Sequence, residues 1–84
     1  MEIFKDNFNE VKLWFLKLAR QLRPIVQCDV KLNQEEDQHG DWFVVTFRDE
    51  KNEGQVTFPI VWAEDEEDNS VKVLIRNEIR KWKK

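Results

Sequence analysis

The fold is decided by residues 41–63, which have the sequence DWFVVTFRDEKNEGQVTFPIVWA. Bulky side chains recur at every second position on both sides of a polar turn at 49–54. A period of two is typical of half-buried β-strands. It predicts strands at 41–48 and 55–63, joined as an antiparallel hairpin. Pro59 lacks a backbone donor, so the second of these strands is expected at an edge of the sheet.

The two predicted strands divide their side chains between two faces. The inward face is expected to carry Phe43, Val45, Phe47, Val56, Phe58, Ile60 and Trp62. The outward face is expected to carry Trp42, Val44, Thr46, Thr57, Pro59 and Val61. Four members of this outward set are apolar, which is more than a solvated sheet face normally shows.

A third strand is predicted at residues 25–32, which also alternate. Val26 and Cys28 begin its inward face, and Val30 and Leu32 continue it.

A helix is predicted at each end of the chain, because apolar residues there recur at steps of three and four. The first covers residues 3–22 and ends before Pro24, since the residue preceding a proline is pushed out of the α region. The second follows Asn69 or Ser70, either of which is expected to cap it, and continues to Trp82.

The resulting order is α-β-β-β-α in one domain, residues 1–84. Short connections favour an antiparallel meander, and the economical packing puts both helices on one face of a three-stranded sheet, an α+β fold. The core is expected to contain Phe8, Val11, Phe15, Leu18, Phe43, Val45, Phe47, Phe58, Ile60, Leu74 and Ile75.

This element order resembles that of the double-stranded RNA-binding domain. The loop with His39-Gly40, between the first two strands, resembles the loop that enters the minor groove in that family. The family meets RNA phosphates through a basic cluster at the start of its last helix. Here that stretch holds five carboxylates, Glu64, Asp65, Glu66, Glu67 and Asp68, beside a single lysine, Lys72. Carboxylates repel phosphates, so tight binding to duplex RNA at physiological salt is not expected.

Composition narrows the function classes further. The 84 residues carry 14 basic and 17 acidic side chains, a net charge of −3, whereas strong nucleic-acid binders are usually basic. Cys28 is the only cysteine, which favours a reducing compartment. The charged N-terminus has no signal-peptide pattern and no run is long enough for a membrane span, so a cytoplasmic location is expected.

Catalysis is not expected, because the chain has one histidine, one cysteine, one serine and no tyrosine. Cys28 is interpreted as a small core residue, His39 as a solvated loop residue, and Ser70 as a helix cap. No metal site or cofactor is predicted, since one histidine and one cysteine cannot make a zinc set.

Two charged segments have a structural and a functional interpretation. The acidic run Glu64–Asp68 complements the positive end of the last helix, or it mimics a nucleic-acid backbone and blocks a basic site on another protein. The cations that surround Trp82 are expected at a helix C-terminus on structural grounds alone. Both structural interpretations are preferred.

The outward face of the sheet is the preferred functional surface. Exposed contiguous apolar surface marks interfaces, and tryptophan is enriched among the residues that dominate binding energy. We therefore expect a small non-enzymatic interaction or regulatory protein, which binds a protein partner or a second copy of itself. The alternatives are a nucleic-acid-associated module and the acidic inhibitor.

Overall fold

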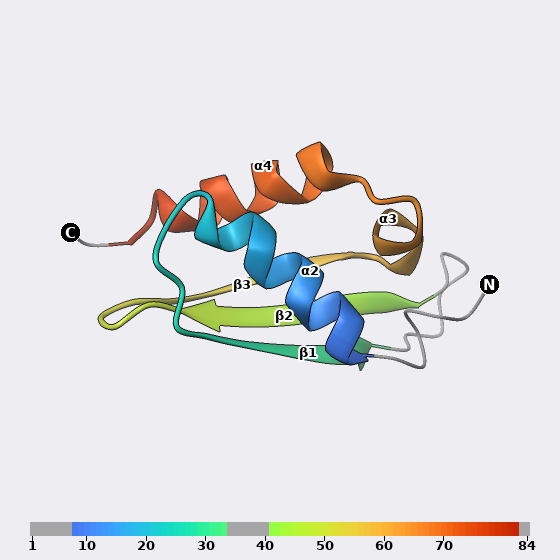
Figure 1. Cartoon of the computed structure of the whole chain (residues 1–84), viewed down its shortest axis with the longest axis horizontal. Coiled ribbons are helices and arrows are strands. Elements are labelled where there is room, and N and C mark those ends of the chain that lie inside the picture. The colour runs from blue at the N-terminus through green and yellow to red at the C-terminus, as the bar shows by residue number, and fades with distance from the viewer. Residues whose placement is uncertain (1–7, 34–40, 83–84) are drawn as a thin grey trace.

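The computed structural model of the chain describes residues 8–33 and 41–82. Helix α2, Phe8–Arg20, leads into strand β1, Gln27–Asn33 (Figure 1). The hairpin follows as β2, Trp42–Arg48, and β3, Glu53–Pro59. A short helix α3, Ile60–Glu64, precedes the last helix α4, Asp68–Ile79. The protein is therefore of the α+β class, and α3 is an element that the sequence did not predict.

The three strands form one antiparallel sheet in the order β1-β2-β3. β2 is central, and its Val45 lies opposite Val30 of β1 and Val56 of β3. Phe43, Val45 and Phe47 are all buried, which confirms the antiparallel arrangement and the inward face predicted for β2.

Helices α2 and α4 lie over the same face of the sheet (Figure 1). The ring of Phe15 on α2 lies 5.4 Å from that of Phe47 and is stacked 6.3 Å from that of Phe58. Trp82, just after α4, places its ring 5.4 Å from the same Phe47. Because both helical ends of the chain pack on inward-facing rings, the opposite face carries no helix among the described residues.

The predicted end of the strand at residues 55–63 was wrong. Pro59, in an extended conformation (φ −63°, ψ 147°), ends β3, and Ile60 begins α3. The apolar run after Pro59 fits a strand and a short buried helix equally well by pattern alone. The helix buries Ala63 and lets Trp62 stack on Phe58, with ring centroids 6.4 Å apart.

Smaller boundary predictions also need correction. β1 begins at Gln27, so Val26 lies before it and is 50% exposed, whereas Ile25 is buried. β3 begins at Glu53, two residues before the predicted start. The first helix is described only from Phe8, and its predicted start lies outside the described residues.

The predicted cap of the last helix was also wrong. The N-cap of α4 is Glu67, and its side chain makes no capping hydrogen bond. Asn69 and Ser70 lie inside the first turn, where the Ser70 hydroxyl donates to the Glu67 carboxylate at 3.3 Å. The preceding residue, Glu66, holds the left-handed conformation that reverses the chain (φ 52°).

The predicted core residues all lie in one cluster. Phe8, Ile60 and Leu74 are partly buried against it, and the other eight are buried. The cluster also buries residues absent from that predicted core set, namely Ala19, Ile25, Cys28, Val56, Ala63 and Val71. Cys28 is therefore a core residue, as the alternation indicated.

Replacing Phe15 or Phe47 with alanine should remove about 3–5 kcal/mol from the free energy of unfolding, because each leaves a large cavity in the core. Domains of this size have only about 5–15 kcal/mol in total. Leu13→Ala is the matched control on the same helix, since Leu13 is 66% exposed. Chemical denaturation measures all three, and a Phe15 variant as stable as the Leu13 variant would contradict the core assignment.

Candidate interaction surface

The outward face of the sheet consists of four cross-strand rows. Strand register places opposed residues on the same face, so each row contains one residue from each strand. From one end of the sheet to the other the rows are Asn33–Trp42–Pro59, Lys31–Val44–Thr57, Asp29–Thr46–Gln55 and Gln27–Arg48–Glu53. The first two rows are apolar at their centre and the last two are polar. The face therefore has an apolar end and a polar end.

Trp42 is the centre of the apolar end. It stands directly opposite Pro59, and Val44 and Thr57 form the next row. Trp42 and Val44 are half-buried, and Thr57 is exposed. The structure thus places five predicted site residues on this one face, the fifth being Thr46 in the third row. We name Trp42, Val44, Thr57 and Pro59 the Trp42 patch.

Val61 does not belong to this patch. It lies on α3, beyond the end of β3, and is 49% exposed. The misplacement follows from the strand prediction that continued past Pro59. Its loss makes the apolar patch smaller than the sequence indicated and confines it to one end of the sheet.

The acidic run forms the connection from α3 to α4. Glu64 ends α3, and Asp65, Glu66 and Glu67 are exposed. Asp68 accepts a hydrogen bond from Trp14 Nε1 at 2.8 Å, which joins α2 to the start of α4. At least one of the five carboxylates therefore has a structural role. A further acidic stretch of the sequence, Glu35-Glu36-Asp37, lies outside the described residues.

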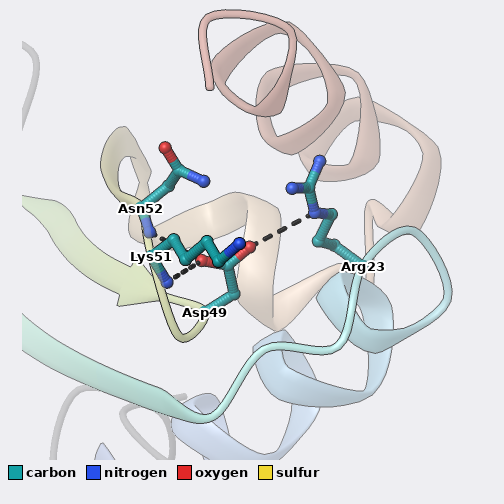
Figure 2. Close-up of polar contacts among 4 residues, drawn as sticks. All are labelled: Arg23, Asp49, Lys51 and Asn52. Carbon is teal, nitrogen blue, oxygen red and sulfur yellow. Dashed lines mark hydrogen bonds and ion pairs between the residues drawn. The ribbon is translucent and has the colours of Figure 1, made fainter. Parts of the chain in front are cut away.

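Asp49 is the one charged residue that is buried in the described chain, at 7% exposure. One carboxylate oxygen accepts hydrogen bonds from the backbone N–H groups of Lys51 and Asn52, at 2.8 and 2.7 Å (Figure 2). The other lies 3.3 Å from Arg23 Nε. These hydrogen bonds, and secondarily the Arg23 charge, lower the pKa of Asp49.

This cluster ties three parts of the chain together. Arg23 also lies over the ring of Trp82, 5.5 Å from its centroid. The guanidinium thus joins the turn after α2, the β2–β3 hairpin and the end of α4. Sequence reasoning missed the cluster, although an aspartate that opens a tight turn is a common device for bonding its own backbone.

The surface beside Asp49 is hollowed. The hollow, of about 290 Å³, is lined by Arg23, Pro24, Val26, Asp49, Glu50 and Lys51. Arg23 and Asp49 are paired with each other, and Asp49 has two backbone donors as well. We therefore assign the pair to holding the hairpin rather than to binding a ligand.

The Asp49 contribution to stability should depend on pH. A folded-state pKa below the ordinary value of 3.8 stabilises the fold above that pH and ceases to do so as pH falls through the folded value. Asp49→Asn should therefore lower Tm at neutral pH, and the deficit should shrink below about pH 4. Glu50→Gln, in the same turn, is the control. A deficit that does not change with pH would contradict a charge-based role.

The Cys28 side chain is buried in the core, at 1% exposure. Burial raises the pKa of the Cys28 thiol to about 11 against a smaller opposing effect of Lys12, so the thiol is protonated at neutral pH and is a poor nucleophile. Among the described residues, no three histidine, cysteine or acidic side chains are placed to hold a metal ion. His39 lies outside the described residues.

Comparison with known proteins adds no relative. No family model, curated protein or solved structure matches the chain. In the described part of the chain, no helix is both long and apolar enough to cross a membrane.

Proposed function

We propose that this chain is a small non-enzymatic interaction domain, which binds a protein partner through the Trp42 patch. The observation that supports this most is a tryptophan on a sheet face that no described helix covers. Its neighbours across the strands are Pro59 and, one row on, Val44 and Thr57. A cluster of this kind supplies the apolar centre of an interface, and the surrounding polar residues supply its rim.

The polar end of the face fits the rim. Arg48 Nε donates to Gln27 Oε1 at 2.9 Å, and Glu53 lies opposite Arg48 on the other side. Charged and amide groups of this kind contribute register and specificity more than binding energy. The proposal therefore places the binding energy on Trp42 and orientation on the polar rows.

Trp42→Ala should weaken partner binding by at least about tenfold while changing the fold little, because a residue that dominates an interface contributes to binding and not to the monomer core. Gln55→Ala is the matched control on the polar part of the same face. Captured proteins are compared between wild type and both variants, and the affinity of any differential partner is then measured.

Circular dichroism accompanies these measurements. Unfolding by Trp42→Ala would place Trp42 in the core and overturn the facing assignment. Binding that survives in Trp42→Ala, or is lost equally in Gln55→Ala, would overturn the proposed site.

A nucleic-acid-associated module is the alternative, because three antiparallel strands with helices on one face resemble the double-stranded-RNA-binding topology. The start of α4 opposes it, since Glu67 occupies the N-cap position of that helix and Asp68 is its first residue. We predict no submicromolar binding to duplex RNA at about 150 mM salt, because these carboxylates occupy the place where phosphates dock. A gel shift of that affinity would establish the alternative.

An acidic inhibitor is the third candidate. Asp65, Glu66 and Glu67 are exposed side by side and could meet a basic site on another protein. Binding of that kind should fall steeply as salt screens the charges, whereas binding through the Trp42 patch should not. Salt dependence of the captured partner therefore separates the two.

A further inference from the structure

The two edge strands of the sheet, β1 and β3, differ in how well they are protected from pairing with another strand. At the β3 edge, the Glu78 carboxylate of α4 accepts a hydrogen bond from the Gln55 backbone N–H at 3.3 Å. Farther along the same strand Pro59 has no N–H to offer. A proline in an edge strand and cover by a neighbouring helix are among the means by which proteins keep an edge strand from pairing. β3 is thus closed to another strand at two positions.

The β1 edge has no such protection among the described residues. β1 pairs with β2 on one side only, over seven residues. Its inward side chains Val30 and Leu32 are only half-buried, although both pack against the core. An added strand would cover apolar surface as well as satisfy backbone groups.

The outward side chains of β1 select one partner strand. Asp29 and Lys31 stand on the same face, and the β2 residues opposite them are Thr46 and Val44, which carry no charge. An antiparallel second copy of β1 centred on Val30 would place each Asp29 opposite a Lys31. A two-fold centred on Asp29 or on Lys31 would instead place like charges opposite each other, which is unfavourable.

We propose that β1 pairs with β1 of a second copy of this chain, antiparallel and centred on Val30, to give a homodimer with one continuous six-stranded sheet. The pairing contains two Asp29–Lys31 contacts on the outward face. On the inward face it joins Val30 to Val30 and Cys28 to Leu32. Every directly opposed pair therefore has matching character.

The test exchanges the two charges. Asp29→Lys and Lys31→Asp each turn both attractive contacts into repulsive ones, and each should weaken the dimer at least about tenfold. The double variant D29K/K31D restores opposite charges and should restore the dimer. Sedimentation across a concentration series measures all four proteins, and circular dichroism confirms that each is folded.

Net charge provides an internal control. It changes from −3 to −1 in Asp29→Lys (−3 + 2) and from −3 to −5 in Lys31→Asp (−3 − 2), and the double variant returns it to −3. A general charge effect would move the two single variants in opposite directions. Weakening in both, with recovery in the double variant, is the expected result for the proposed register.

Three results would overturn the proposal. They are a wild type that stays monomeric at every concentration, single variants that dimerise as wild type does, and a double variant that does not recover. Trp42→Ala should leave the dimer intact, because Trp42 is on β2. The dimer and the Trp42 interface are therefore tested by separate variants, and the failure of one leaves the other standing.

Discussion

The packing of Phe15 against Phe47 and Phe58 is the constraint on which the rest of the structure depends. It draws α2 onto the inward face of the β2–β3 hairpin. Trp82 adds a second contact to Phe47 from the end of α4. Because both helices pack on this face, no described helix covers the opposite face of the sheet. The candidate interface is thus a consequence of where three rings meet.

A glycine makes the second of these contacts possible. A Cβ at Gly54 would lie 2.5 Å from Glu78 Cγ and 3.1 Å from Trp82 Nε1. Only glycine lets the end of α4 come so close to β3, and this approach also brings Glu78 to the Gln55 N–H. The close approach at Gly54 therefore accounts both for the hydrogen bond of Glu78 at the β3 edge and for the packing of Trp82 on Phe47.

Sequence periodicity predicted most of this architecture because it reports burial directly. β2 and the start of β3 alternate cleanly, and the side chains predicted inward there are buried. Periodicity failed after Pro59, where an apolar run of four residues, Ile60–Ala63, contains no polar position to distinguish a strand from a helix. Periodicity also could not predict the Arg23–Asp49 ion pair, because the two residues are 26 positions apart in the sequence and meet only in the folded chain.

The proposed dimer has a consequence for the proposed interface. In that register Asn33 lies opposite Gln27 of the second copy. The row that contains Trp42 and Asn33 in one copy therefore continues into the row that contains Gln27 and Arg48 in the second copy. The two Trp42 patches then lie at opposite ends of one sheet and remain separate. Each copy keeps its own binding site. A bivalent partner would therefore bind two sites at a fixed distance and orientation on one sheet. A domain of this size is also marginally stable alone, so dimerisation would tie the stability of the fold to protein concentration.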